Sequence, residues 1–168
     1  MSKIINIEIK AKCANPQKIR NVLFSLNTKY VGLDHQIDTY FIVNHGRLKL
    51  REGNIENNLI HYDRENISGP KTSNCLLYKS NPGSSLKEIL VKSLGIFKIV
   101  DKKREIFFVN NVKIHLDEVK GLGSFVEIEA ISKNEDFTKE QLLSQCNHFM
   151  EIFEIETEDL IPCSYSDM

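Results

Sequence analysis

Charged side chains recur at every second position in several segments, and this spacing is the feature of the sequence best suited to support chemistry. Glu8 and Lys10 lie two residues apart near the start of the chain, and Glu127 and Glu129 lie two residues apart near its end. Successive side chains of a β-strand point to opposite faces of the sheet, so residues two apart share a face. Each pair is therefore predicted to project from one face of a strand.

The charged rows differ in sign from one segment to the next. Basic rows include Lys49 with Arg51 and Lys102 with Arg104, whereas the rows near the end of the chain are acidic. Lys and Arg neutralise phosphate oxygens, and carboxylates hold Mg²⁺ or Mn²⁺ that bridges the remaining oxygens. Rows of both signs predict a site for a polyphosphate with a divalent metal. For any single strand, a sheet with one face in water explains the same alternation.

The apolar positions indicate the elements that carry these rows. Alternation predicts strands at residues 4–12, 36–43, 47–51, 59–65, 75–79, 97–109, 112–119 and 124–132. Capping residues and apolar stripes predict helices from Pro16 to about Asn27, from Ser85 to about Gly95, and from Thr138 onward, with candidate capping boxes at Ser85 with Glu88 and at Thr138 with Gln141. A short helical turn is expected near residues 158–161. A sheet that curls into a barrel with the helices outside would line its interior with the charged rows. Such an interior is costly unless ions or ligands compensate it.

Composition sets the broad class of protein. With 168 residues and 41% apolar content, the chain is expected to form one domain spanning residues 1–168. The 22 basic and 23 acidic residues nearly cancel, which argues against a nucleic-acid partner. No apolar run reaches the length of about 18 residues that predicts a membrane span. We therefore expect no membrane partner, and we expect a cytoplasmic location. The oligomeric state is not predicted.

The sequence resembles the CYTH, or triphosphate tunnel metalloenzyme, family, in its class IV adenylate cyclase-like branch. The matching segments are Asn6-Ile7-Glu8-Ile9-Lys10, Gln36-Ile37-Asp38-Thr39-Tyr40-Phe41, Leu48-Lys49-Leu50-Arg51, Lys102-Lys103-Arg104, His115-Leu116-Asp117-Glu118-Val119, Gly121-Leu122-Gly123 and Phe125-Val126-Glu127-Ile128-Glu129. The family signature on the first strand has a Glu where this chain has Asn6. That departure bears on whether the site holds a second metal ion.

The resemblance implies an α+β fold built on an eight-stranded antiparallel barrel, a triphosphate tunnel with a polar interior and helices packed outside. It implies triphosphate-binding roles for Lys10, Lys49, Arg51, Arg64, Lys102 and Arg104, and metal-binding roles for Glu8, Asp117, Glu127 and Glu129. Lys10 or Lys12 could also take up a proton, and Lys10 is the candidate for the catalytic role. The implied cofactor is Mg²⁺ or Mn²⁺, and the implied partner is ATP or another small molecule that carries a triphosphate.

Three functions are compatible with this site. The first is the conversion of ATP to cyclic AMP and pyrophosphate, because the chain resembles the adenylate cyclase-like branch. Hydrolysis of inorganic or organic triphosphate, such as thiamine triphosphate, is the alternative, and a non-catalytic protein that binds nucleotide or polyphosphate is the third. His115 is expected to be either a proton carrier or a hydrogen-bonded lining residue, and Tyr165 either covers a tunnel mouth or belongs to a flexible tail.

Overall fold

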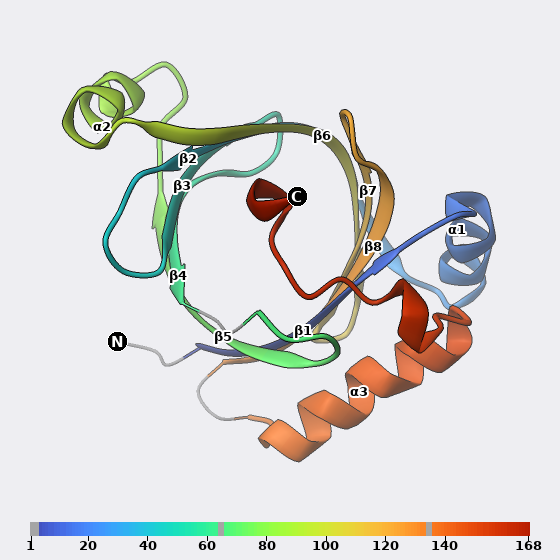
Figure 1. The fold of residues 1–168 in the computed structure, drawn as a ribbon. Helices are drawn as coiled ribbons and strands as arrows, with labels where there is room; N and C mark the ends of the chain where they lie inside the picture. The colour runs from blue at the N-terminus through green and yellow to red at the C-terminus, as the bar shows by residue number, and fades with distance from the viewer. Residues whose placement is uncertain (1–3, 64–65, 134–135) are drawn as a thin grey trace.

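The computed structural model describes residues 4–63, 66–133 and 136–168, apart from the side chain of Asn74. Eight antiparallel strands close into a barrel in the order β1-β5-β4-β3-β2-β6-β7-β8 (Figure 1). The strands are β1 (Ile4–Lys12), β2 (Lys29–Phe41), β3 (Arg47–Gly53), β4 (Asn57–Asp63), β5 (Lys71–Lys79), β6 (Ile96–Val109), β7 (Val112–Val119) and β8 (Gly123–Lys133). The predicted eight-stranded antiparallel barrel and its α+β class are confirmed.

Closure of the barrel depends on two pairings between strands that are distant in sequence. Strand β1 pairs with β8 from Ile4 opposite Lys133 to Lys12 opposite Phe125. Strand β2 pairs with β6 along nearly its whole length, and it begins seven residues before the predicted start at Gln36. The early part of β2 was not predicted because its inward residues, such as Asp34, are polar and give no apolar alternation.

Within the described residues, three helices lie outside the barrel (Figure 1): α1 (Pro16–Ser25), α2 (Leu86–Leu94) and α3 (Lys139–Ile152). Helix α3 begins with the predicted capping box, in which the side chains of Thr138 and Gln141 each accept from the backbone N–H of the other residue. The capping box predicted for α2 is wrong, because the Ser85 side chain makes no capping hydrogen bond. Helix α2 also has no buried residue, so it packs only weakly against the barrel.

The main apolar core lies between the outer wall of β1, β7 and β8 and the helices α1 and α3. Its buried members include Ile9 and Ile128 on the strands, Leu23 on α1, and Leu142 and Phe149 on α3. These strand residues alternate with the charged residues that face inward, so burying the apolar face fixes which side chains enter the barrel. No helix among the described residues is long and apolar enough to cross a membrane.

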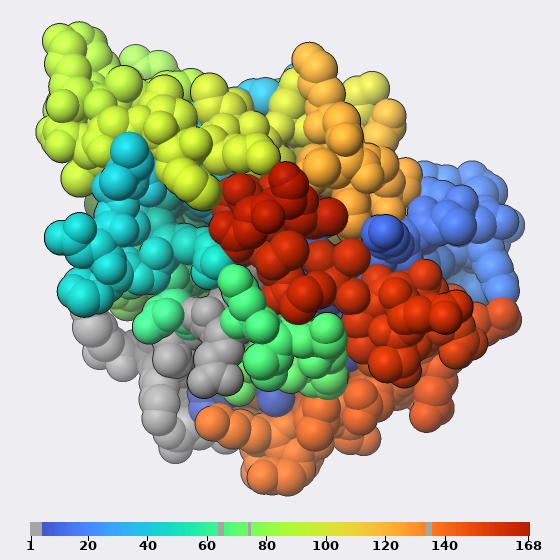
Figure 2. All heavy atoms as spheres, viewed as in Figure 1, coloured from blue at the N-terminus to red at the C-terminus, as the bar shows by residue number. Residues whose placement is uncertain are grey.

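The last residues of the chain return to the barrel and cover one of its ends (Figures 1 and 2). Two short 3₁₀ helices, η1 (Thr157–Asp159) and η2 (Tyr165–Asp167), belong to this segment, and η1 falls close to the predicted turn. The backbone N–H of Ile161 donates to the carbonyl of Lys10 at 2.9 Å, which fastens the segment to the end of β1. Tyr165 is buried at this covered end of the barrel. Of the two expectations for Tyr165, the structure agrees with the one in which it covers a tunnel mouth.

Candidate active site in a charged tunnel

The barrel encloses a cavity of about 260 Å³ whose wall is built from inward-facing polar side chains. The ionisable residues that line it are Glu8, Lys10, Tyr40, Lys49, Arg51, Glu56, Tyr62, Cys75, Lys102, Arg104, Lys113, His115, Glu127, Glu129, Lys133 and Tyr165. The polar interior predicted for the barrel is therefore present.

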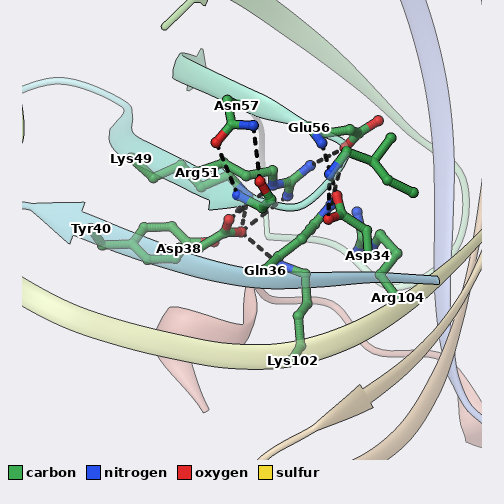
Figure 3. A network of polar contacts seen from close by, with 12 residues as sticks. Asp34, Gln36, Asp38, Tyr40, Lys49, Arg51, Glu56, Asn57, Lys102 and Arg104 are labelled. Atoms are coloured by element: carbon green, nitrogen blue, oxygen red, sulfur yellow. Dashed lines mark hydrogen bonds and ion pairs between the residues drawn. The ribbon is translucent and has the colours of Figure 1, made fainter. Parts of the chain in front are cut away.

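Asp38 is the centre of the basic half of the tunnel (Figure 3). Its carboxylate accepts from Arg51 Nε at 2.9 Å and Nη2 at 3.0 Å, from Lys49 Nζ at 2.9 Å and from Lys102 Nζ at 2.7 Å. These cations reach Asp38 from the strands on either side of it, since β2 lies between β3 and β6. One carboxylate thus holds three cations in a fixed cluster.

The buried charges perturb one another strongly. Burial alone would raise the pKa of Asp38, but the charges of Arg51, Lys102 and Lys49 hold it well below its usual value. Burial lowers the pKa of Lys102 to about 7, because the attraction of Asp38 does not offset the loss of solvent and the repulsion of Arg51 and Arg104. Lys102 is therefore poised to gain a proton when an anion enters the tunnel.

A turn between β3 and β4 brings a further carboxylate to the basic cluster. Asp34 accepts from the backbone N–H groups of Ile55 at 2.8 Å and Glu56 at 3.0 Å, which fixes the turn. The Glu56 carboxylate then receives Arg51 Nη1 at 2.9 Å and also pairs with Lys113 from β7. The charges of Lys113 and Arg51 outweigh burial and lower the pKa of Glu56.

The acidic half of the tunnel lies on β1, β7 and β8. Glu8 stands directly opposite Glu129 in the register of β1 and β8, and like charges in such a position repel unless a cation lies between them. His115 Nδ1 lies 3.3 Å from Glu127 Oε2 and 3.9 Å from Glu129 Oε1. Burial, followed by the charges of Arg104 and Lys113, lowers the pKa of His115 and so favours the neutral imidazole.

Arg104 connects the acidic residues to the C-terminal segment. Its guanidinium binds both oxygens of Asp117, with Nε to Oδ1 at 2.6 Å, and also Glu127 Oε2 at 2.7 Å. The Tyr165 hydroxyl donates to Asp117 Oδ2 at 2.7 Å. Both Asp117 oxygens therefore bind side chains of the protein. Glu127 pairs with Lys10 at 3.1 Å in addition to Arg104.

The donor set at the acidic wall fits a divalent cation. His115, Glu127 and Glu129 each offer one ligand atom, and these atoms lie within 4.8 Å of one another. Two ligands bound about 2.1 Å from one ion are about 3.0 to 3.4 Å apart, close to the spacing from His115 Nδ1 to Glu127. Nearby, Asn6 lines the cavity and its buried Oδ1 has no hydrogen-bond partner. Carboxylate and carbonyl oxygens are ligands that suit Mg²⁺ and Mn²⁺.

The structure brings most of the predicted site residues to one cavity. Those that line it are Glu8, Lys10, Lys49, Arg51, Lys102, Arg104, Glu127 and Glu129. Asp117 is buried behind Arg104 and does not line the cavity, and Arg64 lies outside the described residues. Sequence reasoning missed Asp38, Glu56 and Lys113. Strand alternation through Asp38 and Tyr40, and through Lys113 and His115, was the signal that could have found two of them.

Comparison with known proteins agrees with this architecture. The family model of the CYTH domain matches residues 5–165, so the chain belongs to the CYTH family. It is 26% identical to a Methanocaldococcus jannaschii protein named "Putative adenylate cyclase MJ0240", and the alignment covers 98% of each chain.

Solved structures share the fold. A conserved hypothetical protein from Pyrococcus furiosus superposes with a TM-score of 0.79 at 22% identity, covering 96% of this chain and 98% of that one. The Hippeastrum protein HpAC1, an adenylyl cyclase candidate described with a dominant triphosphatase activity, superposes with a TM-score of 0.61 at 15% identity, covering 95% and 91%.

Proposed function

We propose that this protein cleaves the triphosphate of a small molecule in a reaction that depends on a divalent metal. The observation that carries the proposal is the division of one enclosed cavity into a basic cluster around Asp38 and an acidic wall at Glu8, Glu127 and Glu129. Phosphate oxygens match the first surface, and a metal bridging to those oxygens matches the second.

The basic residues would bind and orient the phosphates. Arg51 and Arg104 present planar guanidinium groups that can each hold two oxygens, and Lys49 and Lys102 add point charges between them. All four side chains are already fixed by carboxylates, so little reorganisation is needed when charge develops in the transition state. An entering triphosphate competes with those carboxylates for the same cations.

The acidic wall would hold the metal through Glu8, Glu127, Glu129 and His115, with Asp117 in support through Arg104. A divalent ion held there would supply Lewis acidity toward the phosphates. Lys10 pairs with Glu127 and its ammonium lies over the Tyr165 ring, contacts that suit a phosphate-binding role. Its role as a proton acceptor stays a prediction. Lys102, with its pKa near 7, is a second candidate for proton transfer.

Hydrolysis is the reaction that the geometry supports best. It needs only a bound triphosphate, a metal and water, whereas cyclisation also needs groups that fix the ribose and its 3′-hydroxyl. Among the described residues, the Phe, Tyr and Trp rings that line the cavity are those of Tyr40, Tyr62 and Tyr165, which gather around the covered mouth rather than where a base would enter. HpAC1, described with a dominant triphosphatase activity, has the same fold.

Cyclisation of ATP is the second candidate, favoured by the name of the M. jannaschii relative, which matches over 98% of both chains. Purified protein incubated with inorganic triphosphate or ATP, with Mn²⁺, Mg²⁺ or chelator, separates the possibilities when all phosphate products are resolved. Metal-dependent orthophosphate supports hydrolysis, and cyclic AMP with equal pyrophosphate supports cyclisation. Tight binding of either compound without any product would contradict the proposed catalysis.

A further inference from the structure

The C-terminal segment, residues 161–168, contributes side chains to the tunnel at its covered end. Tyr165 and Ser164 both line the cavity, and they are only 3% and 1% exposed. The space-filling view shows the end of the barrel filled by atoms of this segment (Figure 2). We call this end the C-terminal mouth.

Side chains of the segment are bound to residues of the tunnel wall. The Tyr165 hydroxyl donates to Asp117, and the Lys10 ammonium lies 3.8 Å from the centroid of the Tyr165 ring. The hydroxyls of Ser164 and Tyr62 are 2.9 Å apart. Phe125 packs on Tyr165 with ring centroids 5.0 Å apart. The segment is thus attached to β1, β4, β7 and β8 at once.

Charged residues around the rim complete the attachment. Lys71 donates to the carbonyls of Ile161 at 3.3 Å and Pro162 at 2.8 Å. Arg47 pairs with Asp167 at 2.6 Å, and Lys98 donates to the carbonyl of Met168 at 3.2 Å. Because Lys71 is only 2% exposed, its backbone contacts satisfy a cation that is expensive to bury.

The opposite mouth has a different character. The cavity residues at that end include Lys133, which is exposed, and Leu77, which is 58% exposed. They lie near the last residue of β8 and of β5, while the C-terminal segment covers the ends where those strands begin. In the part of the chain that the structure describes, this exposed lining marks the end through which solvent and ligand reach the cavity.

We propose that the C-terminal segment makes the tunnel blind, so that the protein accepts only the free end of a polyphosphate and excludes the interior of a chain. This inference rests on the proposed function, because it concerns the substrates of the same cavity. A free triphosphate end enters past Leu77 and advances toward the basic cluster and Tyr165. An internal phosphate cannot reach the same depth, since the rest of the chain would have to leave through the C-terminal mouth.

The substrate class follows from this shape. Short linear polyphosphates and small molecules with a terminal triphosphate fit, with their organic part toward Leu77 and Ile131 at the opposite mouth. A polyphosphate whose two ends are esterified with bulky groups does not fit, although its charge per phosphate is nearly the same. Tyr165 is therefore a specificity-determining residue for chain ends.

Binding of matched polyphosphates tests the proposal on the wild-type protein. Free-ended and end-blocked chains of equal length are titrated at moderate salt with chelator present, so that no turnover occurs. We expect the end-blocked chain to bind at least about tenfold more weakly. We also expect no more than two protein molecules per free-ended chain, whatever its length. Equal affinity for the two chains, or a stoichiometry that rises with chain length, would overturn the proposal.

A variant with the C-terminal mouth loosened provides the reciprocal test. Tyr165→Ala with Asp167→Asn removes the phenol and the rim ion pair, and it should gain affinity for the end-blocked chain. The matched control, Tyr78→Ala with Asp136→Asn, changes the same residue types at exposed positions and should keep the wild-type preference. Unchanged discrimination in a folded Tyr165 variant would show that the segment does not set it.

Amide hydrogen exchange separates this inference from the proposed function. If the wild-type protein binds no polyphosphate of any kind, the proposed function fails. The closure still predicts that the amide of Ile161, bonded to Lys10, exchanges as slowly as amides of the barrel strands. Exchange of residues 161–168 at the rate of an unstructured peptide would refute the closure itself.

Discussion

Replacement of Asp38 by Asn should destabilise the protein and, at the same time, make its stability more dependent on phosphate. The carboxylate of Asp38 is 1% exposed and accepts from Lys49, Arg51 and Lys102. Asn has nearly the same shape but no charge, so three cations lose their common counter-ion. Breaking a buried ion pair by removing one partner costs about 3–5 kcal/mol. For a domain of this size that corresponds to a fall in Tm of about 6–20 °C.

Triphosphate should reverse part of this loss. An entering anion competes with Asp38 for its cations in the wild type, but it replaces the missing charge in Asp38→Asn. Thermal unfolding with increasing inorganic triphosphate, in the presence of chelator, should therefore give a larger rise in Tm for the variant than for the wild type.

A matched control separates this effect from a general change in charge. Asp63→Asn alters an exposed aspartate on β4, and its Tm and its response to triphosphate should stay close to those of the wild type. An Asp38→Asn protein as stable as the wild type, or one that triphosphate stabilises no more than the wild type, would refute the assignment of Asp38 as the counter-ion of the phosphate-binding cations.

Three further predictions concern protons, metal and the fold. Burial lowers the pKa of Lys102 to about 7, so triphosphate binding at pH 8 should be accompanied by proton uptake, and Lys102→Arg should reduce the uptake measured by calorimetry in buffers of different ionisation enthalpy. His115→Gln should weaken Mn²⁺ binding, measured by electron paramagnetic resonance, by about tenfold or more, because a candidate ligand is lost; an unchanged Mn²⁺ affinity would remove His115 from the set of metal ligands. Thr138→Ala should lower the free energy of unfolding by about 1 kcal/mol through loss of the α3 cap, and unchanged denaturant midpoints would contradict the observed capping box.

The barrel was largely predictable because its strands bury one face against helices. Burial of Ile7 and Ile9 forces Glu8 and Lys10 inward, and the bounds of β1 and β7 agree with the predicted segments. The class of the fold and the two signs of charge followed from the same alternation, with the strand number supplied by family resemblance.

What the sequence could not provide depends on contacts between distant segments. Asp38 becomes the hub of the basic cluster only because β6 pairs with β2 and brings Lys102 beside it, 64 positions along the chain. Glu56 lies in a polar segment without periodicity, and its direction is set by Asp34 on another strand. The position of Tyr165 likewise depends on contacts with Asp117 and Lys10. Local sequence patterns therefore did not distinguish a residue that covers a tunnel mouth from one in a flexible tail.

Turnover of inorganic triphosphate by Glu129→Gln tests the central claim most directly. Wild-type, Glu129→Gln and the exposed control Glu151→Gln are compared for orthophosphate release across a Mn²⁺ titration, with circular dichroism to establish equal folding. The proposed metal-dependent cleavage in the tunnel predicts a loss of about 10²-fold or more in kcat for Glu129→Gln and wild-type behaviour for the control. Equal rates and equal metal dependence in all three proteins would contradict it.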